Sequence, residues 1–140
     1  MAEATNYALH LKNRDMIYKN ILQIDDDTDD CDLFLEALQA VSNAIYTSSN
    51  DPVEALRKLT RQEIAPDVIF LDLNMPVMSG MEFLTEIKKN DIVKNIPVII
   101  FSTSQFDDIK RQAKNHGAHD FISKPSDFNE LKKIISLYIS

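Results

Sequence analysis

Four predicted strands of the chain each end in a side chain that can take part in metal or phosphoryl chemistry. In chain order these side chains are Asp25 and Asp26, Asp72, Ser102, and Lys124. We expect them to meet at one edge of a parallel sheet, where open α/β sheets place their ligands. Three neighbouring carboxylates repel one another and stay ionised only if a cation offsets their charge. Oxygen ligands with remaining waters favour Mg²⁺ over zinc, which prefers histidine and cysteine.

A carboxylate that faces Mg²⁺, an ammonium group and a hydroxyl group can attack a phosphoryl group. The metal and Lys124 would neutralise charge on the phosphoryl oxygens, while the Ser102 hydroxyl would donate a hydrogen bond to one of them. Asp72 ends the apolar run at residues 68–71, which is bounded by Pro66 and Pro76 and is typical of a buried parallel strand. The stretch around Asp72 taken alone does not exclude an ordinary aspartate that opens a turn, which is common.

Apolar runs and segments of helical periodicity alternate along the chain. Strands are predicted at residues 18–24, 44–47, 68–72, 97–102 and 121–123. Helices are predicted from about residue 29, from about 51, around 81–87, over about 107–116 and after residue 127. Thr28 or Asp29 would cap the first helix, Pro52 would lie in the first turn of the second, and Asp127 would cap the last. Gly117 follows the fourth helix, where a glycine commonly ends a helix. This alternation indicates an α/β fold, a doubly wound five-stranded parallel sheet flanked by five helices.

Length and composition indicate one compact domain and disfavour nucleic-acid binding. The 140 residues are 44% hydrophobic and 26% charged, and the formal charge of −7 disfavours nucleic-acid binding, because the 15 basic residues are scattered. No apolar run approaches the ~20 residues of a membrane span, and the single Cys31 suits a reducing compartment, so we expect a soluble cytoplasmic protein. Residues 1–17 are interpreted as an N-terminal extension of unknown role, with a short helix or arm at residues 7–11.

Several motifs agree in order and spacing, and jointly they resemble the receiver domain of two-component response regulators over residues 18–140. They are the acidic cluster at 25–27, the loop Leu-Asp-Leu-Asn-Met-Pro-Val-Met-Ser-Gly at 71–80, the hydroxyl that ends the run at 98–102, and Gly-Ala at 117–118 leading to Phe-Ile-Ser-Lys-Pro at 121–125. The resemblance implies the flavodoxin-like strand order 2-1-3-4-5. It also implies a cis bond before Pro125.

The same resemblance implies a role for each site residue. Asp72 would be the phosphoacceptor, with Mg²⁺ held by Asp26, Asp72 and the backbone carbonyl of Asn74, and with Asp25 acting through the water shell of the metal. Lys124 would contact the phosphoryl group. Ser102 and Phe121 would form the conformational switch, although Thr103 or Ser104 could compete with Ser102. The side chains of Asn74 and Ser104 would tune the lifetime of the acyl phosphate.

The resemblance implies a signalling protein that is not an enzyme in the usual sense, because it catalyses only its own phosphorylation and dephosphorylation. Its phosphodonor would be a sensor histidine kinase or a histidine phosphotransfer protein. We expect no output domain after the last helix, which leaves either direct docking on an unknown target protein or onward transfer of the phosphoryl group. Ile135, Tyr138 and Ile139 would give the surface of the fourth helix, fifth strand and fifth helix enough apolar area to form a homodimer.

Two other functions and a calcium site are alternatives to this function. An aspartyl-phosphate phosphohydrolase would place Thr, not Asp29, five residues into the acidic cluster, and a phosphorylation-independent interaction module would not need the intact set of site residues. A calcium loop from Asp25 to Glu36 fails because Asp30 stands where that loop needs glycine. Asp29, Asp30 and Asp32 are interpreted as residues that solvate the start of a helix.

Overall fold

The computed structural model describes residues 18–104 and 106–139, and within them five strands alternate with five helices. The strands are β1 (Asn20–Ile24), β2 (Ile45–Ser49), β3 (Val68–Leu71), β4 (Val98–Ser102) and β5 (Asp120–Ser123). The helices are α2 (Thr28–Val41), α3 (Pro52–Thr60), α4 (Gly80–Lys89), α5 (Asp107–Asn115) and α6 (Phe128–Tyr138). The predicted extension and the helix at residues 7–11 lie outside the described residues. None of the described helices is long and apolar enough to cross a membrane.

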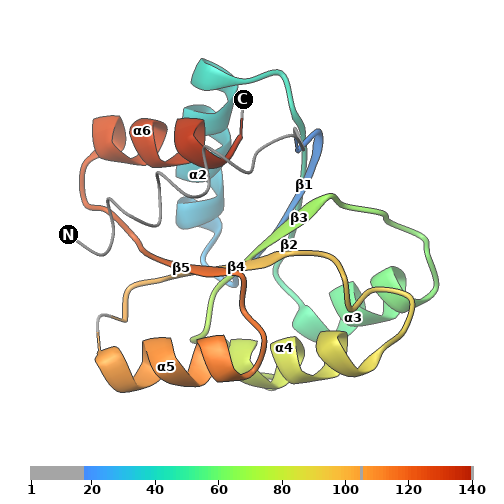
Figure 1. Cartoon of the computed structure of the whole chain (residues 1–140). Coiled ribbons are helices and arrows are strands. Elements are labelled where there is room, and N and C mark those ends of the chain that lie inside the picture. The colour runs from blue at the N-terminus through green and yellow to red at the C-terminus, as the bar shows by residue number, and fades with distance from the viewer. Residues whose placement is uncertain (1–17, 105, 140) are drawn as a thin grey trace.

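All strand pairs are parallel, and the sheet order is β2-β1-β3-β4-β5, which confirms the predicted fold. Helices α2 and α6 cover one face of the sheet, and α3, α4 and α5 cover the other (Figure 1). Every residue of β3 and β4 is buried, as expected for central strands that are covered on both faces. On the first face, the rings of Phe34, Phe70 and Phe101 pack together with centroid distances of 5.0 to 6.5 Å.

Helix starts differ from the prediction at α2. Asp27, rather than Thr28 or Asp29, is the N-cap, and its Oδ1 accepts hydrogen bonds from the backbone N–H groups of Asp29 and Asp30 at 3.0 and 3.2 Å. Thr28 is already helical, so the cap must be the residue before it. The predicted cap Asp127, the place of Pro52 in the first turn of α3 and the position of Gly117 after α5, with φ +101°, are confirmed. Asp51 is the N-cap of α3.

Two further predictions are wrong. The bond between Lys124 and Pro125 is trans, as are all peptide bonds in the described residues. The apolar side chains at the end of α6 are not surface groups either, because Ile135, Tyr138 and Ile139 are 1%, 2% and 0% exposed. They lie in the core that α6 forms with α2 and the sheet, so the argument for a homodimer loses its apolar contact area.

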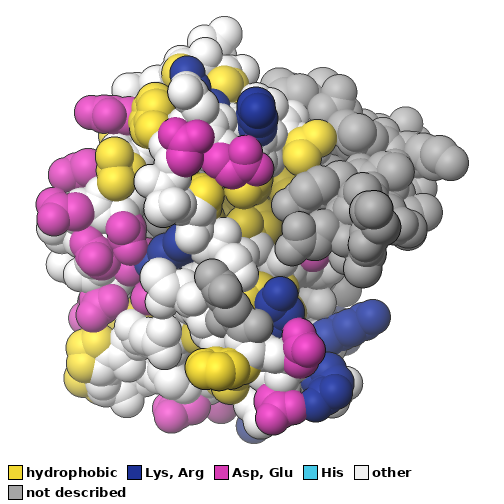
Figure 2. Space-filling model, turned by 90° about the vertical axis from the view of Figure 1, so that its left-hand side faces the viewer, with side chains coloured by type: hydrophobic (Ala, Val, Ile, Leu, Met, Phe, Trp, Pro, Cys, Tyr) yellow, Lys and Arg dark blue, Asp and Glu magenta, His cyan; other side chains and the backbone are white. Residues whose placement is uncertain are grey.

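The edge of the sheet at β5, with α5 and α6 beside it, is turned toward the viewer in Figure 2. Hydrophobic side chains on this face are separated by charged and other polar groups (Figure 2). Phe106 at the start of α5 and Phe128 at the start of α6 are exposed, at 75% and 37%. Dimerisation through this surface therefore stays a prediction without the support of the three α6 residues.

Candidate functional site

The predicted site residues meet at the carboxyl ends of β1, β3, β4 and β5. Parallel register brings them level, since Ile24 pairs with Leu71 and Ser102 pairs with Ser123. One further backbone hydrogen bond between neighbouring strands extends the pairing beyond β3 and beyond β5. Asp72 N–H donates to the Ile24 carbonyl at 3.0 Å, and Lys124 N–H donates to the Ser102 carbonyl at 2.8 Å. The sheet thus positions the site through backbone hydrogen bonds.

Asp25, Asp26 and Asp72 form an acidic cluster in which one carboxylate oxygen from each lies within 4.8 Å of the others. Asp25 and Asp72 are buried, at 1% and 6% exposure, whereas Asp26 is exposed. Burial raises the pKa of both buried carboxyls above their usual range, although Lys124 opposes the shift at each. A divalent cation would remove this penalty by offsetting the charge, and the all-oxygen donor set fits Mg²⁺.

Lys124 extends its ammonium group into the acidic cluster. Its Nζ donates to Asp25 Oδ2 at 2.8 Å and to Asp30 Oδ2 at 2.7 Å, and it lies 3.9 Å from Asp72 Oδ1. Burial alone would lower the pKa of Lys124, but its bonds to Asp25 and Asp30 outweigh that effect and hold the pKa above its usual value. The ammonium group therefore stays charged throughout the neutral range.

Asp30 is the site residue that sequence reasoning missed. It was interpreted as a solvating acid at a helix start, and this is wrong, since its carboxylate pairs with Lys124, which lies 94 residues further along the chain. Asp29 and Asp32 are exposed, as that interpretation expects. No local pattern separates Asp30 from these neighbours, because only the rotation of α2 against β5 selects which acid faces the lysine.

The Ser102 hydroxyl is a buried polar group that lacks a partner. Ser102 is 0% exposed, and its Oγ forms no well-aligned hydrogen bond to any described residue, although it is near enough to Asp72 to lower that carboxyl's pKa slightly. A buried donor without a partner costs about 1–3 kcal/mol, so this hydroxyl is available to a bound oxygen. Thr103, one of its competitors in the sequence, is exposed.

The remaining predicted residues lie around the cluster. Asn74 is exposed, and its backbone N–H helps to lower the pKa of Asp72. The Ser104 carbonyl lies 3.4 Å from Ser123 Oγ, from which it accepts a hydrogen bond. Phe121 in β5 is half-buried, and the Lys110 Nζ lies 5.7 Å from the centroid of its ring. These positions are compatible with the predicted roles. Those roles concern the phosphorylated site.

The loop after β3 packs directly against the backbone of Asp72. Val77 has φ +68°, and the Met78 N–H donates to the Pro76 carbonyl at 2.8 Å, which closes a three-residue turn. Gly80 N–H then donates to the Leu73 carbonyl at 3.1 Å. A Cβ atom at Gly80 would lie only 2.2 Å from the Asp72 carbonyl oxygen, so this position admits no side chain without a shift of the backbone that carries Asp72.

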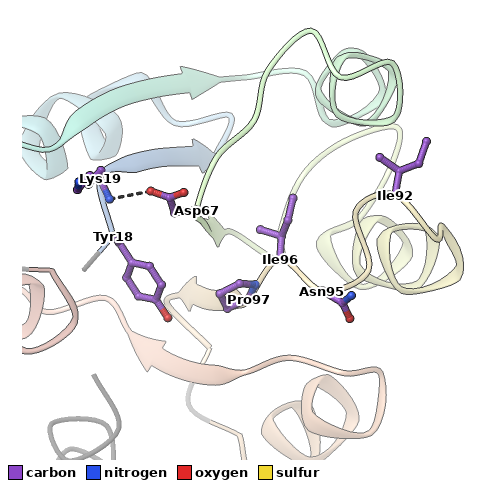
Figure 3. Close-up of a pocket in the computed structure, with 7 residues that line it drawn as sticks. All are labelled: Tyr18, Lys19, Asp67, Ile92, Asn95, Ile96 and Pro97. Carbon is purple, nitrogen blue, oxygen red and sulfur yellow. Dashed lines mark hydrogen bonds between the residues drawn. The ribbon is translucent and has the colours of Figure 1, made fainter. Parts of the chain in front are cut away.

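A pocket of about 460 Å³ lies beside the amino ends of β1, β3 and β4, whereas the acidic cluster lies at the carboxyl ends of the strands (Figure 3). It carries no comparable cluster of acids. Its one carboxylate belongs to Asp67, whose Oδ2 accepts hydrogen bonds from the backbone N–H groups of Lys19 and Asn20 at 2.8 and 2.9 Å. The Asp67 carboxylate therefore holds the start of β1 in place.

Curated relatives match parts of the chain. A protein-glutamate methylesterase/protein-glutamine glutaminase of Treponema denticola is 51% identical over 74 residues, which cover 51% of this chain and 19% of that protein. Protein PilH of Pseudomonas aeruginosa is 35% identical over 59% of this chain and 67% of its own length. The chain thus spans about a fifth of the first relative and two thirds of the second.

Solved structures match nearly the whole fold. The phosphorylated cyanobacterial phytochrome response regulator RcpA superposes with a TM-score of 0.76 at 31% identity, covering 85% of this chain and 89% of that one. The Mn²⁺-bound response regulator Rcp1 gives 0.72 at 26%, covering 84% and 89%. Chemotaxis protein CheY4 of Vibrio cholerae gives 0.72 at 28%, covering 85% and 97%. A family model for the response regulator receiver domain matches residues 21–136. The chain therefore belongs to the family of response regulator receiver domains.

Proposed function

We propose that Asp72 accepts a phosphoryl group from a phosphohistidine on a sensor histidine kinase or a histidine phosphotransfer protein. The observation that carries this proposal is the convergence of Asp72 with two further acids, a charged lysine and a buried hydroxyl that lacks a partner. In the reaction, an Asp72 carboxylate oxygen bonds to phosphorus while the bond from phosphorus to the histidine nitrogen breaks. The electron pair of that bond leaves with the imidazole.

The nucleophile must be ionised, and burial works against this because it raises the pKa of Asp72. Mg²⁺ held by Asp25, Asp26, Asp72 and the Asn74 carbonyl would supply the offsetting positive charge and neutralise the phosphoryl oxygens. The related structures are consistent with this chemistry, since RcpA was solved phosphorylated and Rcp1 was solved with Mn²⁺.

Lys124 and Ser102 serve the transferred group in this proposal. The ammonium group lies 3.9 Å from Asp72 Oδ1 and needs only a small shift to reach a phosphoryl oxygen. The Ser102 hydroxyl would gain its missing partner by donating to another phosphoryl oxygen. Movement of Ser102 toward Asp72 would leave space for the half-buried Phe121 to turn inward, which would reshape the surface of α5, β5 and α6. A target protein that reads this surface is the expected partner.

Membership of a signalling family favours this function over an aspartyl-phosphate phosphohydrolase. The test is the intact mass of the protein after incubation with acetyl phosphate. We expect one added phosphoryl group with Mg²⁺ present, none after removal of the metal with EDTA, and none in Asp72→Asn. Labelling of Asp72→Asn at the wild-type rate would refute the assignment, and sustained release of phosphate from phosphomonoesters would favour the hydrolase.

A further inference from the structure

Lys124 is bonded in this structure to two acids other than the proposed phosphoacceptor. Its side chain is 10% exposed, and two of its three donors are directed to Asp25 and Asp30 at 2.8 and 2.7 Å. The Asp72 Oδ1 atom lies 3.9 Å from the Lys124 Nζ, which is within the range of an ion pair but beyond hydrogen-bond distance. The Lys124 ammonium group, which must contact a phosphoryl group on Asp72, is thus held mainly by Asp25 and Asp30.

The fold fixes Asp30 in this place. It lies in the first turn of α2, where its backbone N–H bonds to the Asp27 cap at 3.2 Å. One turn further on, Phe34 is 1% exposed and anchors α2 on the sheet through its contacts with Phe70 and Phe101. The contact between Asp30 and Lys124 therefore joins the start of α2 to the end of β5.

The two acids that hold Lys124 differ in their access to water. The side chain of Asp25 is 1% exposed, whereas that of Asp30 is 31% exposed. A buried carboxylate that loses its partner cannot be rehydrated and pays the full cost of desolvation, while a partly exposed one recovers hydrogen bonds from water. When Lys124 gives up a bond to reach a new partner, the bond to Asp30 is the less costly one to lose.

We infer that Asp30 is a positioning residue that holds the Lys124 ammonium group away from Asp72 until Asp72 carries a phosphoryl group. This inference rests on the proposed function. Phosphorylation would exchange the bond from Lys124 to Asp30 for a bond to a phosphoryl oxygen, while the bond to Asp25 persists. Asp30 therefore stabilises the unphosphorylated state selectively and lowers the affinity of the site for the phosphoryl group.

Removal of the Asp30 charge should affect the binding of Mg²⁺ and the binding of a phosphoryl mimic differently. Mg²⁺ binding should weaken or stay unchanged, because one negative charge near the cluster is lost. Binding of a phosphoryl mimic at saturating Mg²⁺ should tighten by roughly three- to tenfold, the factor expected for one partly exposed, charge-assisted hydrogen bond. Loss of structure would weaken both, so the split between them identifies a positioning role.

The experiment is a calorimetric titration with beryllofluoride at saturating Mg²⁺. Wild type is compared with Asp30→Asn, with Asp30→Ser as a second variant, with Asp30→Glu as the conservative rescue, and with Asp29→Asn as the matched control. Asp29 lies one residue earlier in the same turn, is exposed, and forms no ion pair within the described part of the chain, so its substitution removes the same charge without touching Lys124. The Asp30→Asn change is also made in a Lys124→Met background.

We expect tighter beryllofluoride binding in Asp30→Asn and Asp30→Ser, near wild-type binding in Asp30→Glu and Asp29→Asn, and no effect of Asp30→Asn once Lys124 is replaced. The inference is overturned if Asp30→Asn binds like wild type, if Asp29→Asn tightens binding equally, or if the effect persists without Lys124. Absence of beryllofluoride binding in wild type would instead refute the proposed function, and the inference with it.

Discussion

Gly80→Ala tests whether the loop after β3 positions Asp72. A Cβ atom at this position would lie 2.2 Å from the Asp72 carbonyl oxygen, 2.7 Å from the Leu73 Cα and 2.9 Å from the Asp72 carbonyl carbon. All three neighbours are backbone atoms, so no side-chain rotation relieves the overlap. Ordinary van der Waals contact begins at 3.4 Å, and the backbone at Asp72 must therefore move by about 1 Å relative to α4.

The change in the free energy of unfolding follows from two opposing effects. Alanine favours the helix over glycine by at most about 1 kcal/mol, and less here because Gly80 is the first residue of α4. Overpacking of a well-packed site costs about 1–3 kcal/mol, and the backbone clash places this one at the upper end. We expect a net loss of about 2 kcal/mol in the free energy of unfolding. A 1 Å displacement of Asp72 should also lower the rate of phosphorylation by up to about 100-fold.

Urea unfolding and the rate of labelling by acetyl phosphate measure these two effects separately. Gly117→Ala is the matched control, because its φ of +101° also makes alanine unfavourable, by about 1–2 kcal/mol. The three atoms nearest to its Cβ would all belong to the flexible Lys88 side chain, whose Nζ bonds to the Ile96 carbonyl before the start of β4. Both variants should lose stability, and only Gly80→Ala should lose labelling under conditions where it is folded. Wild-type stability and labelling in Gly80→Ala would refute the packing argument.

Three other predictions concern the ionisable groups. Mg²⁺ at ten times its Kd should raise the free energy of unfolding by about 1.4 kcal/mol, and by less in Asp72→Asn, as a thermal-shift titration would show. Without metal, the pKa values of Asp25 and Asp72 are raised in the folded state, which therefore binds protons more readily than the unfolded state. The free energy of unfolding should consequently increase as the pH falls from 7 toward these pKa values. Urea unfolding at a series of pH values should show a weaker pH dependence of that free energy in Asp72→Asn. The half-buried Cys31, whose pKa desolvation raises to about 11, should react with iodoacetamide at pH 8 much more slowly than it does in urea. Equal rates would contradict this partial burial.

Most of the fold is encoded locally. The central strands β3 and β4 are apolar runs because both of their faces are covered, and β1 differs from them by Asn20 and the buried Gln23. Parallel pairing then brings the carboxyl ends of all three strands together. The edge strand β2 is mostly polar and exposed, with the sequence Ile-Tyr-Thr-Ser-Ser, so its last two residues gave no apolar signal and the prediction ended at Thr47. Local patterns thus locate strands best where the sheet is most buried.

The parts that were missed depend on tertiary geometry. The pairing of Asp30 with Lys124 requires the rotation of α2 relative to β5, to which neither segment's own sequence refers. The burial of Ile135, Tyr138 and Ile139 likewise depends on how α6 packs against α2 and the sheet, because a wide apolar stripe does not show how much of it a neighbouring element covers. The meeting of five predicted site residues at one side of the sheet could be predicted, because each of them lies at the carboxyl end of a strand or just after it. These residues are Asp25, Asp26, Asp72, Ser102 and Lys124.

The proposed function requires that Asp72 itself carries the phosphoryl group. The direct measurement is borohydride reduction of the protein after labelling by acetyl phosphate and Mg²⁺, followed by peptide mass spectrometry, because reduction converts an aspartyl phosphate into homoserine. We expect homoserine at position 72 and unchanged aspartate at positions 25 and 26. Homoserine at either of those positions, with Asp72 intact, would contradict the proposed function.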